Sequence, residues 1–545
     1  MMELHPIQLP PSNPLAADYL ENFSRVAGFY RHPATDGWAA AVEERRGYTS
    51  PRAELAAVLR EQHRRWGAGA ASLENVDRLQ QPHTLAVVTG QQAGIFGGPL
   101  YTFYKIMTTI RLAGHLQGQF PEFQFVPVFW LEVNDHDFKE INHICYITRE
   151  NRLAHLSVPE VEEEAYLPIH RRRVSPALQE WAQALQEDFF DTEFKEEAIA
   201  TFLAPYSGDT TYADAFARLM VHFFGEAGLV ILNPADPAVA PLARPIFARA
   251  IESAEGIISV FRERNEELQQ AGYPDQIHLR HNQVLLFYSD EEFRRARMEF
   301  DGKGQFVVHY PGGGEERLSR EEALRRCRET PERFSPNVAL RPLVQDHLLP
   351  TVAYVAGPSE IAYFAQLETL YRLLEIPMPV VYPRHRLTIV EGKIHRLVEK
   401  LGLDYAEVVQ ASPEFIGEYL RAHGDRSLFE ATEAAEQEIE AILSRLEQTF
   451  SRADPTLMRP FKKTRQQIRD GFKRLSGRIT RSLEEREKTV VQQLERVVLH
   501  LCPERHPQER VLNMIYFCIK YGVDFPHRLL EALPVESRSG FLVFL

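Results

Sequence analysis

The chain has 545 residues, of which 44% are hydrophobic and 25% are charged, a composition typical of a folded protein too long for one ordinary core. Its net charge of −14 disfavours broad binding to nucleic acid or to an anionic membrane, and no apolar run reaches the roughly 20 residues that span a bilayer. The N-terminus lacks the basic and apolar regions of a signal peptide, and the four cysteines form no CxxC pair, so we expect a cytoplasmic protein without a zinc site.

Five short apolar runs predict buried parallel strands, because each is bounded by glycine, proline or asparagine. They cover residues 84–88, 125–131, 229–232, 352–357 and 379–382. Amphipathic helical sequence lies between them, as in Phe103, Ile106, Met107 and Ile110, which keep the i, i+3, i+4, i+7 spacing. This alternation predicts an α/β fold with a doubly wound, Rossmann-like core.

The spacing between these runs leaves room for insertions. Residues 141–148 and 152–158 predict one β-hairpin, and residues 283–288 with 306–310 predict a second, joined by polar, glycine-containing sequence. We therefore expect core segments at residues 1–140, 221–280 and 336–384, interrupted by inserted subdomains at 141–220 and 281–335.

From about Arg384 onward, glycine becomes sparse and the apolar residues follow a heptad-like stripe. The stripe runs through Ile439, Ile442 and Leu446 in a first arm and through Ile468, Phe472, Leu475, Ile479, Val490, Leu494 and Val497 in a second. Pro455 and Pro460 predict the turn between the arms. We expect an antiparallel α-helical coiled coil over residues 385–505 and an amphipathic segment, 506–545, that docks on the core.

The second arm begins with a cluster of basic residues, against which Asp470 is the one acid. The cluster consists of Arg459, Lys462, Lys463, Arg465, Arg469, Lys473, Arg474, Arg478 and Arg481. It is either a solvated face or a contact for an acidic partner or RNA. The apolar stripe could serve dimerisation or simply close the hairpin.

A glycine-rich stretch, "TGQQAGIFGGPLYTFYK", follows the first predicted strand. A strand that ends in glycines before a helix places backbone N–H groups where an anion can approach. Tyr101 and Lys105, at i and i+4, share the helix side opposite Phe103 and Ile106. The alternative is a tight turn followed by a surface lysine. The candidate ligand-binding residues are Thr89, Gly90, Gln91, Gln92, Gly94, Gly97, Gly98, Tyr101 and Lys105.

A second polar cluster, "VFWLEVNDHDFKEINH", follows the second predicted strand. Asp135, His136, Asp137 and Glu140 crowd its carboxyl end, which is where ligands bind in open α/β sheets. A histidine beside carboxylates can act as a general base or hold a divalent ion, although too few further ligands are visible for a metal site. The alternative is a helix N-cap at Asn134 or Asp135.

A third cluster, "LRPLVQDHLLPTVAYVAGPSEIAYFAQL", repeats the pattern of strand, glycine turn and polar helix start. Ser359 is expected to be the N-cap, and Glu360 suits the first helical turn. The candidate ligand contacts are Gln345, Asp346, Gly357, Ser359, Glu360, Tyr363 and Gln366. Residue spacing alone indicates an enzyme with an anion-binding site on an α/β core.

Together, these three stretches resemble the bacillithiol biosynthesis cysteine-adding enzyme family, and their order, the chain length and the helical C-terminal region agree with it. The resemblance implies a core similar to class I nucleotidyltransferases, two connecting insertions and a coiled coil used in homodimerisation. It also implies a ligase that adds L-cysteine to glucosaminyl-malate by amide formation. The family usually carries an acid where this chain has Asn134, so the match is carried by Asp135, His136 and Asp137.

Amide formation requires an activated cysteine carboxyl, so we expect ATP or another nucleotide as cofactor, with Mg²⁺ as an optional companion and no zinc. The backbone of residues 89–98 and Lys105 are the expected phosphate donors, and His136 or Asp137 is the expected base. Two alternatives stay open: a nucleotidyl or acyl transferase acting on another small amine, or a non-catalytic nucleotide-binding scaffold. Membranes are not expected partners, and nucleic acid is disfavoured.

Overall fold

The computed structural model describes residues 2–9, 11, 13–280, 282–424, 427–535 and 539–545, which fall into two compact units. The first comprises residues 1–389 and 509–545, and the second comprises residues 390–508, where the sequence led us to expect 385–505. Across the described part of the chain, no helix is both long and apolar enough to cross a membrane.

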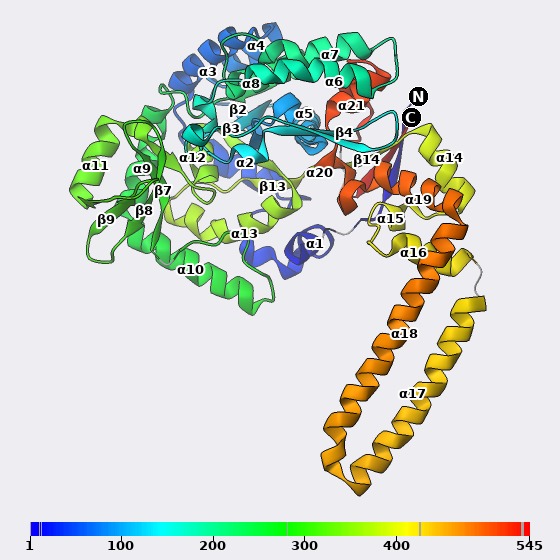
Figure 1. Cartoon of the computed structure of the whole chain (residues 1–545). Coiled ribbons are helices and arrows are strands. Elements are labelled where there is room, and N and C mark those ends of the chain that lie inside the picture. Colours follow the sequence, from blue (N-terminus) through cyan, green and yellow to red (C-terminus); the bar gives the residue numbers. More distant parts are fainter. Residues whose placement is uncertain (1, 10, 12, 281, 425–426, 536–538) are drawn as a thin grey trace. The chain divides into compact units, whose positions relative to one another are not determined.

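Five parallel strands form the central sheet of the first unit in the order β13-β12-β2-β3-β6. They are β2 (Thr84–Gln92), β3 (Gln124–Glu132), β6 (Val230–Leu232), β12 (Thr351–Ala356) and β13 (Val380–Pro383). Figure 1 labels three of them, β2, β3 and β13. The chain winds outward from β2 through β3 and β6, then returns to the other side through β12 and β13. This order confirms the doubly wound, Rossmann-like core and places a topological switch point between β2 and β12.

Both faces of the sheet are covered, which explains why its strands read as continuous apolar runs. Along β2, Leu85 and Val87 pack into one apolar cluster with Leu116, while Ala86 and Val88 pack into a second. Leu116 belongs to α5 (Leu100–Gln119). The other helices of this part are α1 (Pro14–Glu21), α2 (Trp38–Arg46), α3 (Arg52–Trp66), α4 (Ala70–Arg78), α9 (Ala240–Glu252), α10 (Ala254–Gln270), α12 (Arg341–Leu348) and α13 (Pro358–Leu373).

The edge of the sheet at β6 is closed by two side chains of α3. The Gln62 amide donates to the Asn233 carbonyl and accepts from the Asn233 N–H, both at 3.0 Å. His63 Nε2 accepts from the Ile231 N–H at 3.0 Å, and its Nδ1 donates to the Leu59 carbonyl at 2.7 Å. These side chains satisfy backbone groups that a bare edge strand would present to another chain.

The first insertion contains the predicted hairpin, formed by β4 (His143–Ile147) and β5 (Leu153–Ser157). It continues through α6 (Trp181–Asp188), α7 (Lys195–Leu203) and α8 (Tyr212–Phe224).

The second predicted hairpin is wrong in its pairing. This region is an antiparallel sheet in the order β10-β9-β8-β7-β11, in which β7 pairs with β8 and β11 rather than with β9. The strands are β7 (Gln283–Ser289), β8 (Arg295–Phe300), β9 (Gln305–His309), β10 (Glu315–Ser319) and β11 (Phe334–Pro336), and α11 (Arg320–Glu329) follows β10. In β8, buried Ala296, Met298 and Phe300 alternate with charged residues, so a half-buried strand looked like polar connecting sequence.

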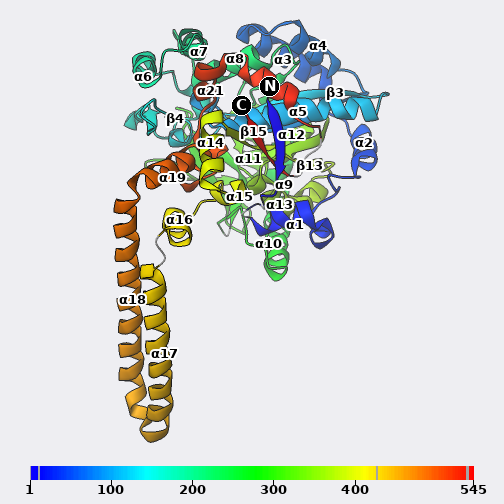
Figure 2. The ribbon, with the colours of Figure 1, turned by 90° about the vertical axis from the view of Figure 1, so that its right-hand side faces the viewer.

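The C-terminal segment packs onto the glycine-rich stretch. Asn513 Nδ2 donates to the Gly98 carbonyl at 2.7 Å, and the Leu100 N–H donates to the Leu512 carbonyl at 2.9 Å. The segment contains α20 (Gln508–Val511), α21 (Met514–Tyr521), α22 (Phe525–Ala532) and β15 (Gly540–Phe544). Strand β15 lies between β1 (Glu3–Ile7) and β14 (Arg386–Val390), so the two ends of the chain lie side by side (Figures 1 and 2).

The second unit is helical and confirms the predicted antiparallel coiled coil. Its long helices α17 (Ser427–Ala453) and α18 (Met458–Arg486) run side by side in both views (Figures 1 and 2). Arg465 forms ion pairs with Glu440 and Glu447, so part of the basic cluster faces the acidic side chains of α17. The remaining helices are α14 (Gly392–Leu401), α15 (Tyr405–Val408), α16 (Phe415–His423) and α19 (Lys488–Leu501).

The second arm is shorter than predicted, because α18 ends at Arg486. Val490, Leu494 and Val497 belong instead to α19, which packs against α14. The stripe therefore continues across a break between two helices.

Candidate functional site

A cavity of about 210 Å³ opens at the carboxyl ends of β2, β3 and β12, at the topological switch point. Six predicted residues line it: Gly90, Gln91, Gln92, Asp135, Glu360 and Tyr363. The structure thus brings together one part of each of the three polar clusters, although they lie far apart in the sequence.

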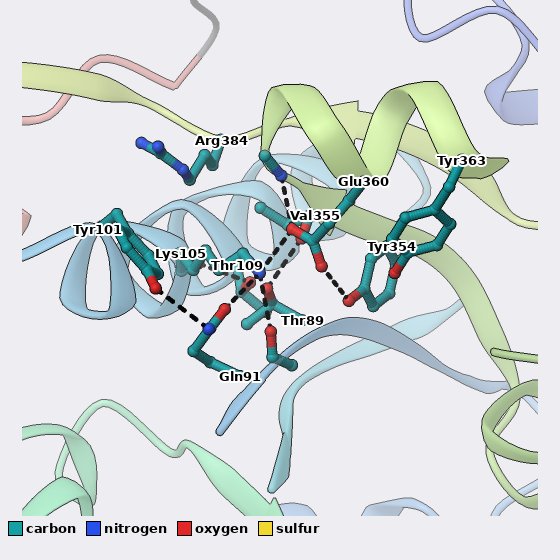
Figure 3. A network of polar contacts seen from close by, with 12 residues as sticks. Thr89, Gln91, Tyr101, Lys105, Thr109, Tyr354, Val355, Glu360, Tyr363 and Arg384 are labelled. Carbon is teal, nitrogen blue, oxygen red and sulfur yellow. Dashed lines mark hydrogen bonds and ion pairs between the residues drawn. The ribbon is translucent and has the colours of Figure 1, made fainter. Parts of the chain in front are cut away.

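Lys105 is buried rather than exposed, and its ammonium is fully engaged. Its Nζ donates to the Gly90 carbonyl at 2.8 Å and to Gln91 Oε1 at 3.1 Å, and it lies 2.5 Å from Glu360 Oε2 (Figure 3). An ammonium has three donors, so none is left for a phosphate. Burial lowers the pKa of Lys105, while Glu360 opposes that shift. Lys105 is therefore not the expected phosphate donor. Instead, it holds Gln91 and Glu360 in place at the cavity wall.

Tyr101 shares the Lys105 side of α5, as expected, and reaches the cavity through Gln91. Gln91 Nε2 donates to the Tyr101 hydroxyl at 3.2 Å, while Gln91 Oε1 accepts from Lys105 (Figure 3). Thr89 lies deeper, where its hydroxyl donates to the Val355 carbonyl at 2.8 Å. Thr89 thus ties β2 to β12 beneath the cavity and does not line it.

The turn from Gly94 to Gly98 is a packing turn and not an anion cradle. The N–H groups of residues 94, 95, 97 and 98 donate to carbonyl groups within the protein, and that of Phe96 donates to the Tyr206 hydroxyl. Gly97 and Gly98 adopt positive φ values of 85° and 70°, which glycine favours. A side chain at Gly94 would lie 2.7 Å from the Gly98 Cα. The backbone donors of residues 94–98, which are part of the stretch expected to bind phosphate, are therefore already used.

Of the four residues predicted in the second cluster, Asp135 alone is among those that line the cavity. It accepts a hydrogen bond from Gln92 Nε2 at 3.4 Å and lies 3.6 Å from Arg295 Nη1. His136 stacks against Tyr166 with ring centroids 6.1 Å apart, and exposed Asp137 accepts from the Lys139 N–H as a helix cap.

The other members of this cluster also depart from expectation. Glu140 is exposed as a whole residue and does not line the cavity. Its carboxyl group is nevertheless partly shielded from solvent, which raises its pKa together with the nearby charges of Asp137 and Asp135. The observed cap is Asp137, where Asn134 or Asp135 was the expected alternative. The predicted bases, His136 and Asp137, therefore lie outside the cavity wall.

Three predicted contacts of the third cluster are core residues. Gln345 and Asp346 are fully buried, and Asp346 accepts from the Tyr371 hydroxyl at 2.5 Å. Gln366 is also buried and accepts from the Ile277 N–H at 2.9 Å. Each is satisfied by protein groups and is absent from the cavity wall.

Helix α13 begins differently from the prediction. Gly357, not Ser359, is its N-cap, and Ser359 is exposed in the first turn. The Gly357 N–H donates to Glu360 Oε2 at 2.7 Å, and the Tyr354 hydroxyl donates to Glu360 Oε1 at 2.7 Å. Burial raises the pKa of Glu360, but Lys105, Gly357 and Tyr354 together bring it below its ordinary value. Glu360 is therefore a fixed carboxylate at this wall.

Sequence reasoning does not identify the other eight wall residues: Trp130, Glu132, Arg295, Pro336, Asn337, Val338, Arg341 and Tyr354. Glu132 lies in the quoted second stretch at the carboxyl end of β3, so its strand-end position could have indicated it. Arg341 lies in the quoted third stretch but begins α12, and Arg295 lies on β8, whose charged alternate residues resemble polar connecting sequence, so neither has that signal.

Only part of the wall fits a nucleotide phosphate. Since the backbone donors of residues 94–98 are engaged, the remaining candidates are the guanidinium groups of Arg295 and Arg341, because a guanidinium suits phosphate. Arg295 is held by the Pro336 carbonyl at 2.7 Å and by Phe287, whose ring centroid lies 3.8 Å away. Among the described residues, no three His, Cys, Asp or Glu side chains are grouped so as to hold a metal ion.

Comparison with known proteins identifies the family over nearly the whole chain. Residues 2–385 match the N-terminal Rossmann-like domain of bacillithiol biosynthesis BshC, and residues 387–544 match its C-terminal coiled-coil domain. A protein of Salinibacter ruber named "Putative cysteine ligase BshC" is 34% identical over 97% of this chain and 96% of its own length. One of the same name from Chloroherpeton thalassium is 33% identical over 98% and 95%. Because both domains and full-length relatives agree, this chain belongs to the bacillithiol biosynthesis BshC family.

Proposed function

We propose that this chain is a cysteine ligase of bacillithiol biosynthesis that joins the carboxyl of L-cysteine to the amine of glucosaminyl-malate. The observation that carries the proposal is the full-length match to relatives named as cysteine ligases. In the reaction, a carbon–nitrogen bond forms, the bond from the cysteine carboxyl carbon to its leaving oxygen breaks, and the amine loses a proton. The charged cavity at the switch point is the proposed place for this chemistry.

The cavity wall supports the proposal through the charges it presents. Glu132, Asp135 and Glu360 supply carboxylates, and Arg295 and Arg341 supply guanidinium groups. Trp130, Tyr354 and Tyr363 supply aromatic surface that limits the entry of water. ATP, when bound, would supply the leaving group at the cysteine carboxyl, and Arg295 is the residue proposed to meet its phosphate charge.

We further propose that the protein works as a cytoplasmic homodimer formed through the helices α17 and α18. Ile442, Leu446 and Leu475 of the predicted stripe remain 40–47% exposed within the hairpin. They are available to a second copy, which supports the dimerisation alternative for the stripe.

The function is tested by incubating the purified chain with L-cysteine, glucosaminyl-malate and ATP and detecting the amide product by mass spectrometry. We expect product only when both substrates and a nucleoside triphosphate are present, with parallel reactions that omit ATP or replace it with GTP. Nucleotide binding without any product would instead favour a non-catalytic scaffold. Product from another amine, but none from glucosaminyl-malate, would favour a different transferase.

A further inference from the structure

Glu132 and Arg341 carry opposite charges at the cavity wall and attract each other, but neither forms a contact ion pair among the described residues. The Glu132 carboxylate accepts from Trp130 Nε1 and from the Asn134 N–H, each at 3.2 Å, and forms no ion pair with any described residue. Arg341 is only 8% exposed and donates to Gln345 Oε1 at 2.9 Å and to the hydroxyls of Tyr354 and Tyr363 at 3.2 Å. Its hydrogen-bond partners in the described chain are all neutral, while the carboxylates of Glu132 and Glu360 act on it without a direct contact.

The other charges of the same wall are matched. Glu360 is paired with Lys105 at 2.5 Å, and Asp135 lies 3.6 Å from Arg295. Burying an unmatched charge is costly, so a protein retains one where a ligand supplies the partner. The wall therefore leaves one carboxylate and one guanidinium without a contact ion pair, and a ligand in the cavity can supply a direct partner for each.

Asn337 adds an independent sign of a ligand beside Arg341. It is 5% exposed and lines the cavity, and its Nδ2 has no hydrogen-bond partner among the described residues. Its Oδ1 accepts from the N–H groups of Ala339 and Leu340, each at 3.0 Å, which fixes the orientation of the amide. Buried donors are rarely left unsatisfied, and an anionic oxygen would satisfy this one together with Arg341.

We propose that Arg341 and Asn337 bind a carboxylate of the ligand, that Glu132 binds its amine, and that Glu132 accepts the proton that the ammonium releases. In that step a nitrogen–hydrogen bond breaks, an oxygen–hydrogen bond forms on Glu132, and the electron pair stays on nitrogen. The proton step rests on the proposed function, whereas the binding assignment does not require it. Glu132 thereby takes the role that the sequence suggested for His136 or Asp137.

The geometry suits this role because both ends of the site are held in place. Trp130 and the Asn134 N–H fix the two oxygens of Glu132, and three neutral side chains fix the Arg341 guanidinium. Burial raises the pKa of Glu132, although Arg341 and Arg295 oppose that shift, so the carboxylate is a better proton acceptor than an exposed one. Both proposed substrates carry an amine and a carboxylate.

The binding assignment is tested by calorimetric titration in two arms that separate these two sources. One arm compares glucosaminyl-malate with its N-acetyl derivative, and the other compares L-cysteine with N-acetyl-L-cysteine. The wild-type chain should prefer the free amine by about tenfold or more in one arm, and Glu132→Gln should reduce that preference to within about twofold. Asn337→Asp, which places a negative charge at the carboxylate, should weaken binding in the same arm by about tenfold or more.

Exposed Glu122→Gln is the matched control and should bind like the wild type. Circular dichroism and a thermal melt of each variant establish that it is folded, and Glu132→Asp serves as the charge-conserving variant, expected to keep part of the preference. The binding assignment is overturned if Glu132→Gln keeps the amine preference of the wild type in both arms, or if Asn337→Asp binds normally.

Turnover tests the proton step separately. If the wild-type chain forms product, Glu132→Gln should lower kcat by about a hundredfold or more at saturating substrate, since general-base catalysis contributes on this order. Unchanged kcat in that variant overturns the step while leaving the proposed function intact. If the wild-type chain forms no product yet shows the amine preference, the proposed function fails and the binding assignment stands.

Discussion

Lys105 shows how burial changes the role of a charged side chain, from an expected ligand contact to a structural ion pair. Its place on α5 was inferred from helical spacing, but the pairing with Glu360 depends on α13, which lies more than 250 residues later in the chain. Together the two side chains place an ion pair in contact with Gln91, because Lys105 also donates to Gln91 Oε1 (Figure 3).

At the residue scale, we expect Lys105→Met to lower the free energy of unfolding by about 3–5 kcal/mol, because it leaves the Glu360 carboxylate buried without its partner. The double variant Lys105→Met/Glu360→Gln should recover part of this loss. All four tryptophans, at positions 38, 66, 130 and 181, lie in the first unit, so urea unfolding followed by tryptophan fluorescence reports on this unit alone. Lys139→Met, at an exposed position, is the control. If Lys105→Met were as stable as Lys139→Met, the ion-pair argument would be contradicted.

His63 makes stability depend on pH. Burial lowers its pKa from 6.5 to about 4, and its Nε2 must stay unprotonated to accept from the Ile231 N–H. Between pH 6.5 and pH 4 the unfolded chain binds a proton that the folded chain does not, so the free energy of unfolding falls as pH falls. From pH 7.5 to pH 5 this residue should account for a loss of about 2 kcal/mol.

Burial also lowers the pKa values of His170, His347 and His385 to about 4, so these residues contribute to the pH dependence of stability as well. The variant His63→Gln separates the contribution of His63 from theirs. We expect it to be less stable at pH 7.5 by about 1–3 kcal/mol but to lose less stability on acidification. Urea unfolding at pH 7.5 and pH 5 measures both effects. Exposed His83→Gln should keep the wild-type pH dependence, and an identical dependence in His63→Gln would refute the assignment.

At the scale of elements, the glycine-rich stretch divides into two parts with different roles. Gly90, Gln91 and Gln92 extend β2 and pair with Trp130, Leu131 and Glu132 of β3, which brings them to the cavity. The following turn, from Gly94 to Gly98, joins β2 to α5 and packs against the C-terminal segment.

We expect Gly97→Ala to destabilise the first unit by about 2–4 kcal/mol, because it combines a positive φ with a steric clash. The new Cβ would lie 2.5 Å from Phe103 Cε2, and the φ of Gly97 is 85°. Gly114→Ala in the middle of α5 is the matched control, since a Cβ there meets no atom within 4 Å. It should raise stability by up to about 1 kcal/mol, so the two changes should shift the urea midpoint in opposite directions.

At the scale of the whole molecule, the hairpin of α17 and α18 closes on some of its apolar residues and leaves others exposed. Leu443 and Phe461 are 6% and 7% exposed, whereas Ile442 and Leu446 are 47% and 40% exposed. Heptad spacing indicated a coiled coil but did not distinguish the residues that close the hairpin from those left for another chain.

The proposed homodimer predicts that Ile442→Glu/Leu446→Glu yields a monomer, because charges replace apolar surface that a second copy would bury. Size-exclusion chromatography with light scattering measures the mass directly. Thr449→Glu adds a charge at an exposed position of the same helix and serves as the control. A dimer that survives the double substitution would place the interface elsewhere.

The type of the central sheet, but not its strand order, could be predicted, since five apolar runs separated by helices lead to a doubly wound core. Residues such as Gly90 and Asp135, which line the cavity, could be placed at one edge of the sheet because the carboxyl ends of parallel strands converge there. The pairing of β7 with β8 could not, because the alternating side chains of Arg295–Phe300 dilute the hydrophobic signal of that strand.

The amino-acid sequence by itself determined the fold class, the coiled coil and the family, since these depend on periodicity and on long local motifs. Only the tertiary structure decided which polar residues reach the cavity. Gln366 and Glu360 lie on one helix, yet one is satisfied in the core and the other lines the site. The charges of Glu132 and Arg341 likewise gain their meaning only from their partners, because whether a buried group is matched depends on distant segments that local sequence does not specify.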